Sequence, residues 1–382
     1  MSTPLPRPFT LAVAEADITD LKQRLAVTRW PDEPPLAPWS TGASLAYLKD
    51  ITQYWRTGFD WRAWEEKLNG FRQFKVEIDG IDLHFIHEPG RGRDPMPLLI
   101  SHGWPGSVLE FHKLIGLLKE QFTIIAPSLP GYTLSFTPGQ RRLGIEDIAD
   151  LYAKLMGDVL GYRRFGAQGG DWGAFIASLL ALRYPELLTG IHLNLLAVRR
   201  DGRLPDGGTA EEKAFLAQLG HFLKEETGYQ WMQGTKPQTL AFALTDSPSG
   251  LAAWIIEKFR TWTDCEGNPE NAVSRDEMLA NISLYWFSGA IGSAFWPYYA
   301  RMHGPWPIAE GKTIGVPMGY AEFPKEILTP PRSLAERSYA NIKRWSKMTR
   351  GGHFAALEQP EALAREIIAF FADLSKVNPG RA

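Results

Sequence analysis

The chain has 382 residues, of which 44% are hydrophobic and 22% are charged, and its formal net charge is −2. This ordinary balance is that of a globular protein and gives no reason to expect long disorder. The absence of long Lys or Arg runs gives no reason to expect a nucleic-acid partner. The length fits one large domain with additions, or two domains.

Cysteine content and hydropathy indicate the cellular compartment in which the protein is expected. The single cysteine, Cys265, cannot form an internal disulfide, so the fold does not depend on an oxidising environment. Residues 1–10 lack the apolar run of a signal peptide, and no later segment approaches the ~18–20 apolar residues that span a bilayer. We therefore expect a soluble, cytoplasmic protein without membrane contact. The oligomeric state stays open, a homodimer included.

The first part of the chain has the periodicity of helices and is rich in aromatic residues. Three runs are predicted as helices: Ile18–Thr28, Leu45–Thr57 and Trp61–Leu68. Two alternating strands follow, Phe74–Ile78 and Ile81–Ile86, and Asp79-Gly80 between them is a strong hairpin signal. We expect residues 1–93 to form a helical arm and a first hairpin that pack on the main domain.

Strands and helices then alternate. Short apolar runs are predicted as strands: Met96–Ser101, Phe122–Ala126, Arg164–Gln168 and Ile191–Leu195. Amphipathic or apolar runs between them are predicted as helices: Val108–Lys119, Ile145–Leu160 and Trp172–Tyr184. This alternation predicts an α/β fold with a mostly parallel sheet and helices on both faces. We assign residues 94–196 to this core.

The alternation stops after residue 196. Three helical stretches follow one another without strands: Glu211–Thr227, Leu251–Thr261 and Asp276–Phe287. Strand-like Thr313–Met318 restarts the earlier pattern, and helical Glu361–Leu374 closes the chain. We therefore expect residues 197–303 to be a helical lid inserted into the core, which resumes over residues 304–382.

The most specific local signal is Gly169-Gly170-Asp171-Trp172-Gly173, between a predicted strand and a predicted helix. This context is typical of the nucleophile elbow of an α/β-hydrolase, where a tight turn projects the central side chain. A carboxylate there needs no base for activation and can attack an electrophilic carbon to form an ester. A glycine-rich turn with Asp171 as a helix cap is the alternative interpretation.

A second motif, His102-Gly103-Trp104-Pro105-Gly106, directly follows the first buried strand of the core. The loop at this place in an α/β-hydrolase supplies one backbone N–H of the oxyanion hole, and the residue after the nucleophile supplies the other. We therefore expect the amides of Trp104 and Trp172 to form the hole. For the His102 side chain, orienting the loop is favoured over catalysis.

Tryptophan is unusually frequent, with 14 residues, many of them after residue 225. Large flat side chains crowded into one region indicate the walls of an apolar pocket. We expect Trp231, together with His102 and Pro105, to contact an apolar substrate.

The third motif is Arg350-Gly351-Gly352-His353-Phe354, which precedes the final helix. An α/β-hydrolase places its histidine in such a late loop, after the nucleophile and the acid in chain order. Of the eight histidines only His353 has this position, so it is the candidate general base. A histidine in an exposed loop without catalytic function is the alternative.

Together these motifs resemble the microsomal-type epoxide hydrolase family, here without its membrane anchor, over nearly the whole chain. The resemblance implies the α/β-hydrolase fold with that family's N-terminal arm. Further segments carry it: Thr28-Arg29-Trp30-Pro31-Asp32, Thr235-Lys236-Pro237-Gln238-Thr239, Asp246-Ser247-Pro248-Ser249-Gly250 and Phe323-Pro324-Lys325-Glu326.

The resemblance implies further site residues. Two lid tyrosines of that family bind and protonate the epoxide oxygen, and they correspond to Tyr229 and Tyr298. Tyr299 is adjacent and is the alternative to Tyr298. The acid that orients the histidine corresponds to Glu326, with Glu322 as the alternative.

The implied reaction converts an apolar epoxide and water into a diol. Asp171 opens the ring to give a hydroxyalkyl ester, and water activated by His353 and Glu326 hydrolyses the ester. No cofactor is needed, and no His/Cys spacing indicates a metal site. A haloalkane dehalogenase and a catalytically silent binding protein are the alternatives. The lid tyrosines count against the first, and the presence of both Asp171 and His353 counts against the second.

Overall fold

The structure, a computed structural model, describes residues 5–198 and 208–377. Two predictions partly concern residues outside these ranges. They are the lack of a signal peptide at the N-terminus and the start of the lid just after residue 196.

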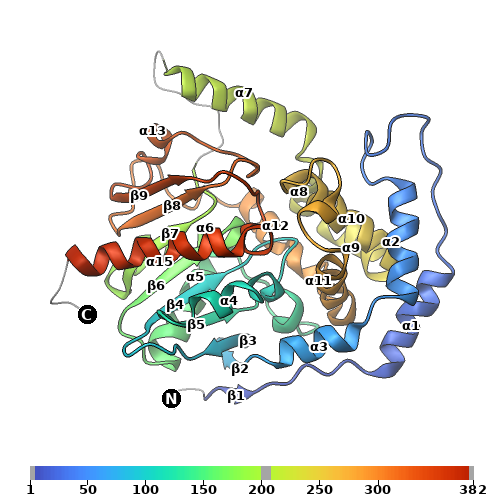
Figure 1. The fold of residues 1–382 in the computed structure, drawn as a ribbon, viewed down its shortest axis with the longest axis horizontal. Helices are drawn as coiled ribbons and strands as arrows, with labels where there is room; N and C mark the ends of the chain where they lie inside the picture. Colours follow the sequence, from blue (N-terminus) through green and yellow to red (C-terminus); the bar gives the residue numbers. More distant parts are fainter. Residues whose placement is uncertain (1–4, 199–207, 378–382) are drawn as a thin grey trace.

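A nine-stranded sheet runs through the described part of the chain, in the order β1-β2-β3-β5-β4-β6-β7-β8-β9 (Figure 1). From β5 to β9 all neighbours pair in parallel, whereas β1, β2 and β3 form an antiparallel edge. This confirms the predicted mostly parallel sheet. The strands are β1 (Arg7–Pro8), β2 (Gln73–Ile78), β3 (Ile81–Glu88), β4 (Met96–Ser101), β5 (Phe122–Pro127), β6 (Phe165–Gly169), β7 (Leu188–Leu193), β8 (Met318–Glu322) and β9 (Ile342–Lys347).

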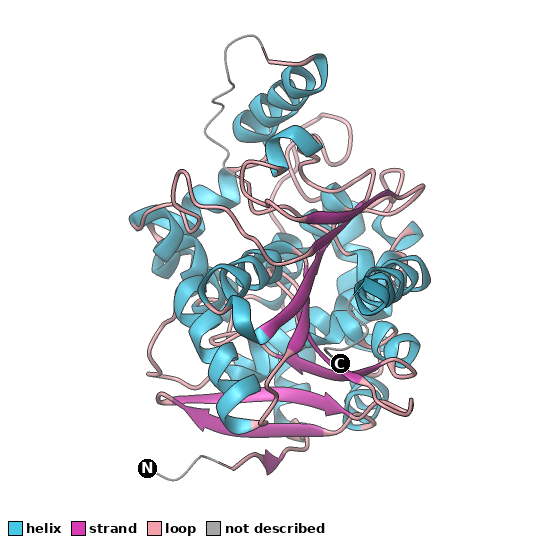
Figure 2. Cartoon of the chain, turned by 90° about the vertical axis from the view of Figure 1, so that its left-hand side faces the viewer, coloured by secondary structure: helices cyan, strands magenta, loops and turns pink. Residues whose placement is uncertain are grey.

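Helices cover both faces of this sheet (Figure 2). Because its central strands are buried on both sides, they are continuous apolar runs, and Leu98, Leu99 and Ile100 of β4 are all fully buried. Helix α4 packs on α15 and α5 on α6. The helices of the core are α4 (Leu114–Leu118), α5 (Ile145–Lys154), α6 (Asp171–Arg183), α13 (Arg332–Ala335), α14 (Ala355–Glu358) and α15 (Pro360–Val377).

The N-terminal arm contains α1 (Glu15–Ala26), α2 (Leu45–Thr57) and α3 (Trp61–Asn69), as the periodicity predicts. These helices lie beside the lid helices in Figure 1, and polar bonds join the two layers. The indole of Trp55 donates to the Ser283 hydroxyl at 3.0 Å, and the Tyr54 hydroxyl donates to Asp276 at 2.8 Å. The arm therefore supports the lid from outside.

The lid has six helices among the residues that the structure describes. They are α7 (Ala210–Glu225), α8 (Gly228–Thr235), α9 (Pro237–Asp246), α10 (Pro248–Trp262), α11 (Arg275–Ser288) and α12 (Trp296–His303). The three long ones match the predicted stretches. The three short ones were missed because eight to ten residues give a weak periodic signal.

The predicted hairpin turn is present. Asp79 and Gly80 have φ angles of 52° and 79°, the left-handed backbone that a two-residue turn of this kind requires. Ile78 and Ile81 pair directly across it.

Three predictions in the core are wrong in detail, and one strand was missed. The strand expected over Thr313–Met318 instead begins at Met318, because Pro317 lacks the N–H that a ladder residue donates. Strand β9 was not predicted, since its sequence IKRWSK has the charged side chains that protect a sheet edge. Val108–Lys119 is not one helix but a 3-10 turn, η1 (Val108–Phe111), followed by α4. The helix predicted to run to Leu160 leaves α geometry at Leu155 and continues as a π-helical turn.

Candidate active site

Asp171 lies in a tight turn between β6 and α6, at the carboxyl end of the central strands. Its φ of 46° is left-handed backbone, which is strained for a residue with a side chain and recurs at functional sites. An added Cβ on Gly169 would lie 2.2 Å from the Gly173 oxygen, and one on Gly173 would lie 2.0 Å from the Ser101 oxygen. The two glycines are therefore a steric requirement of the turn that projects Asp171.

The loop after β4 brings one amide to this carboxylate. The Trp104 N–H donates to Asp171 Oδ1 at 2.8 Å. Gly103 permits the approach, because a Cβ there would lie 2.1 Å from the same oxygen. The Trp172 amide belongs to the first turn of α6, where backbone N–H groups have no acceptor within the helix. Its part in an oxyanion hole stays a prediction.

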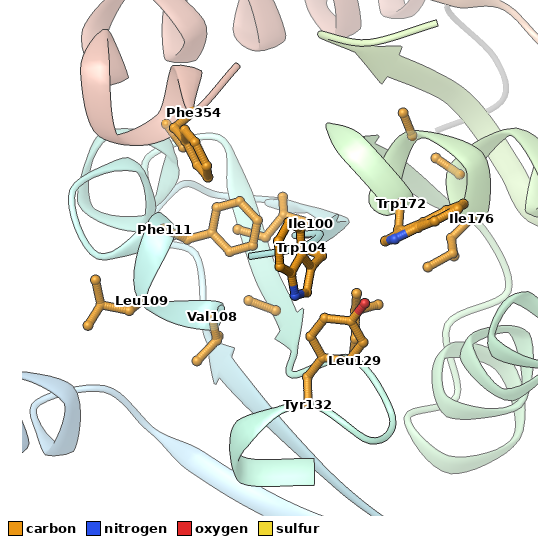
Figure 3. Packing of buried hydrophobic residues seen from close by; sticks show 14 of the residues in the cluster. Ile100, Trp104, Val108, Leu109, Phe111, Leu129, Tyr132, Trp172, Ile176 and Phe354 are labelled. Carbon is orange, nitrogen blue, oxygen red and sulfur yellow. The ribbon is translucent and has the colours of Figure 1, made fainter. Parts of the chain in front are cut away.

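The side chain of His102 holds this loop. The Leu129 N–H donates to His102 Nε2 at 3.0 Å, and Nδ1 lies 3.0 Å from the Gly103 oxygen, to which it donates. Burial lowers the pKa of His102 to about 4, so the ring is neutral. The interpretation that His102 orients the loop fits these bonds, and they leave neither ring nitrogen for a substrate. Trp104 and Ile100 lie in the buried cluster shown in Figure 3.

His353 joins Asp171 to a second carboxylate. Its Nε2 lies 3.4 Å from Asp171 Oδ2, and its Nδ1 lies 2.6 Å from Glu326 Oε1. The Glu326 side chain is fully buried and also accepts from the Ile327 N–H at 2.7 Å. The alternative acid, Glu322, is elsewhere and accepts from the indole of Trp345 at 2.8 Å. Of the two carboxylates, the structure brings only Glu326 to His353.

The charges around His353 determine its protonation. Burial alone lowers the pKa of His353, but the nearby Glu326 and Asp171 carboxylates outweigh it and raise the pKa to about 10. At neutral pH the ring is therefore an imidazolium between two carboxylates. It becomes a base only if one of those negative charges is removed.

Tyr229 of α8 and Tyr298 of α12 line the same cavity as Asp171. Both are buried, and their ring centroids are 5.7 Å apart. Tyr229 stacks on Trp104 with an interplanar angle of 10°, and Tyr298 meets Trp172 edge-on at 4.8 Å. Burial raises the pKa of Tyr298 well above its ordinary value, so its phenol stays a hydrogen-bond donor. These aromatic contacts hold both tyrosine rings in the wall of a cavity that Asp171 also lines.

The tyrosines and Asp171 line a cavity of about 320 Å³, which we call the lid cavity. Most of its other walls are apolar, with Phe175, Trp306 and Ile327 among them. Phe175 could have been predicted, because it lies one helical turn after Asp171 on α6. Trp306, by contrast, lies in a loop after the lid, and no pattern in the sequence indicates it.

Trp231, Pro105 and Tyr299 are not among the residues that line the lid cavity. The side chain of Trp231 is 60% exposed on α8 and does not line the cavity, so its substrate contact stays a prediction from the sequence. Pro105 follows a cis peptide bond, and its oxygen accepts a hydrogen bond from the Asn281 side chain of α11 at 2.8 Å. Tyr299 stacks on His303 and faces a different cavity, so Tyr298 is the tyrosine that meets Asp171.

Within residues 5–198 and 208–377, no group of three or more His, Cys, Asp or Glu side chains could hold a metal ion. None of the helices in the same residues is long and apolar enough to cross a membrane.

Known proteins share this architecture. Residues 6–111 match the family model for the epoxide hydrolase N terminus, and residues 96–208 match the model for the alpha/beta hydrolase fold. The chain is 39% identical to Epoxide hydrolase 1 of Oryctolagus cuniculus over 404 residues, which covers 95% of the chain and 88% of the relative.

Two solved structures extend the similarity. The epoxide hydrolase of Aspergillus niger is 31% identical with a TM-score of 0.84, over 98% of this chain and 97% of that one. The juvenile hormone epoxide hydrolase of Bombyx mori is 30% identical with a TM-score of 0.88, over 98% and 96%. The chain therefore belongs to the epoxide hydrolase family and is a hydrolase with the α/β-hydrolase fold.

Proposed function

We propose that the chain converts apolar epoxides to vicinal diols in two steps, through a covalent ester on Asp171. One observation carries the proposal. The Asp171 carboxylate lies between the Trp104 N–H and His353 Nε2, and it lines the lid cavity together with two buried tyrosines.

The first step is ring opening. The Trp104 amide holds Asp171 Oδ1 at 2.8 Å, whereas Oδ2 has only the longer contact with His353 Nε2 at 3.4 Å, so Oδ2 is the oxygen that attacks an epoxide carbon. As the new Oδ2–C bond forms, the C–O bond of the ring breaks, and the released alkoxide takes a proton from Tyr229 or Tyr298. An alkoxide is a poor leaving group, so a phenol positioned as general acid lowers the barrier to ring opening. General acid catalysis typically raises the rate by about 10²–10⁴-fold.

The second step is ester hydrolysis. Esterification removes the negative charge of Asp171, one of the two charges that raise the pKa of His353. The imidazolium then gives up its proton, which replaces the one that the tyrosine lost during ring opening. The neutral ring, oriented by Glu326, becomes the base that takes a proton from water. The Trp104 amide stays at Oδ1, where negative charge develops as water attacks.

The apolar walls of the lid cavity support an apolar epoxide as substrate. A haloalkane would need donors for a departing halide, whereas two neutral phenols suit an alkoxide oxygen. A binding protein without catalysis would not need a strained carboxylate beside an imidazole. The cytoplasmic location and a homodimer stay predictions from the sequence.

The test uses styrene oxide as probe and measures diol formation together with the mass of the intact protein. We expect Asp171→Ala to abolish diol formation. His353→Gln should instead gain the mass of one substrate, because it forms the ester without hydrolysing it. Full activity in Asp171→Ala would refute the central claim, and an unlabelled His353→Gln protein would refute the ester.

Chloride release from 1-chlorohexane, measured on the same wild-type preparation, tests the rival reaction. We expect none above background. If the protein released chloride from 1-chlorohexane and formed no diol from styrene oxide, it would be a dehalogenase that uses Asp171 as its nucleophile.

A further inference from the structure

Glu110 is a carboxyl group close to Asp171 that the two-step scheme above does not use. It belongs to η1, directly after the loop that carries the Trp104 amide. Its carboxyl group lies against Gly106, where an added Cβ would lie only 1.4 Å from Glu110 Oε1. The lack of a side chain at Gly106 therefore lets Glu110 turn inward toward the catalytic residues.

Glu110 lines a second, smaller cavity of about 20 Å³, which we call the rear chamber. Asp171 and His353 line the same chamber. Among the described residues, Asp171 alone lines both the rear chamber and the lid cavity. Asp171 thus lies between the lid cavity, which holds the substrate, and the rear chamber, which His353 lines.

The rear chamber has the size and the polar walls that a single water requires. A water needs about 10–15 Å³ of such volume and two to four polar partners. Besides Glu110 and His353, the chamber is lined by Gln168 and Asn194. The buried Gln168 Oε1 has no hydrogen-bond partner among the described residues, whereas its Nε2 donates to Asn194 at 2.9 Å.

The surroundings keep Glu110 neutral. Burial raises the pKa of Glu110 to about 8, and the nearby Asp171 charge acts in the same direction against the opposing influence of His353. A neutral carboxyl group has one O–H donor and a carbonyl acceptor. No hydrogen bond joins this group to another described side chain, so both functions are available to a water.

We propose that Glu110 is a positioning residue that holds the hydrolytic water in the rear chamber, between His353 and the carbonyl carbon of the Asp171 ester. The proposal rests on the two-step function above. Glu110 accepts one O–H of the water and leaves the other O–H directed at His353 Nε2. A lone pair of the water then faces Asp171 Cγ.

The step balances without a further reactant. The water oxygen bonds to Asp171 Cγ as its proton moves to His353 Nε2, and the resulting tetrahedral oxyanion collapses with cleavage of the Cγ–O bond to the diol. The leaving alkoxide recovers the proton from His353. Asp171 is left as a carboxylic acid that carries the oxygen of the water, and it returns its proton to His353, which restores the carboxylate and the imidazolium. Glu110 is unchanged.

Single-turnover kinetics with styrene oxide separate the two steps. Tryptophan fluorescence follows ester formation and decay, because Trp104 and Trp172 flank the nucleophile. Glu110→Leu removes both hydrogen-bonding functions at similar size, and Glu110→Gln keeps a donor and an acceptor. We expect the leucine variant to slow ester hydrolysis about 10–100-fold and ring opening by less than about threefold, so that the ester accumulates.

The glutamine variant should restore hydrolysis to within about fivefold of the wild type, because an amide can hold the water as a neutral acid does. An equal loss in both steps of Glu110→Leu would overturn the proposal, since it indicates general damage to the site. Ester hydrolysis as slow in Glu110→Gln as in Glu110→Leu would also overturn the proposal.

Gly106→Ala tests the same idea without changing Glu110, and it serves if Glu110→Leu does not fold. The new methyl group displaces only the end of the flexible Glu110 side chain, so the backbone is preserved. We expect the same selective loss of ester hydrolysis. Wild-type hydrolysis in Gly106→Ala, with Glu110 moved out of the chamber, would refute the assignment.

The wild type separates failure of this proposal from failure of the proposed function. If the wild type forms no ester with styrene oxide, the two-step function fails. If it forms and hydrolyses the ester, but Glu110→Leu hydrolyses it at the same rate, only the assignment of Glu110 fails.

Discussion

Replacement of Gly173 by alanine perturbs the elbow without touching a catalytic group. The added Cβ would lie 2.0 Å from the Ser101 oxygen and 2.6 Å from the Ser101 carbonyl carbon. Both atoms are backbone of β4, so no side-chain rotation relieves the contact. A comfortable separation of non-bonded heavy atoms is about 3.5 Å, so α6 and β4 must move apart by roughly 1.5 Å.

This displacement has two measurable consequences. Overpacking of a buried site typically costs about 1–3 kcal/mol, so we expect the free energy of unfolding to fall by about 2–3 kcal/mol. The Asp171 carboxylate begins the same helix, and a shift of a reacting group by about 1 Å can cost about 100-fold in rate. Urea denaturation measures the first effect, and diol formation from styrene oxide measures the second.

Gly116→Ala is the matched control. Gly116 lies exposed in α4, and apart from the adjoining backbone of the helix no described atom is within 4 Å of its added Cβ. Alanine in a helix is favoured over glycine by about 0.5–1 kcal/mol, so stability should rise slightly and the rate should not change. Wild-type stability and rate in Gly173→Ala would refute the steric account of the elbow.

Two further predictions concern charge. Glu326→Gln should slow ester hydrolysis by about 10²–10⁴-fold, because a neutral amide no longer orients and stabilises the imidazolium. The control variant Glu322→Gln should hydrolyse the ester within about threefold of the wild-type rate. Equal losses of the two variants in single-turnover assays would contradict the assignment of Glu326. Burial lowers the pKa of His84 to about 3 and of His102 and His192 to about 4, so the folded chain takes up their protons later than the unfolded chain as the pH falls. Their contribution to stability is complete above about pH 6.5 and is lost toward pH 4. We therefore expect the free energy of unfolding, measured by urea denaturation, to fall by about 1–2 kcal/mol per histidine between pH 7 and pH 5. Constant stability over that interval would show that these rings are not held neutral.

The elbow shows what the sequence predicts best. Gly169 and Gly173 are required by contacts within a few residues and with the adjacent strand, and a strand–turn–helix context is visible in the sequence itself. The apolar runs of buried parallel strands, such as β4, are equally local signals, because both faces of those strands are covered. The α/β fold was therefore predicted correctly, although the charged edge strand β9 was missed.

The other parts of the site depend on packing between distant segments. Tyr298 and Tyr299 are neighbours in the sequence, but the orientation of α12 directs only Tyr298 toward Asp171. Trp231 lies two residues after Tyr229 on α8, and a rotation of about 200° around the helix places it in solvent.

The sequence by itself determined the tight turn at Asp171 and the mostly parallel sheet, because backbone sterics and hydrophobic periodicity act over a few residues. Only the tertiary structure decided which carboxylate meets His353, which lid aromatics line the cavity and that Glu110 faces Asp171. Those outcomes depend on how helices far apart in the chain pack and rotate against one another. No local pattern encodes that rotation.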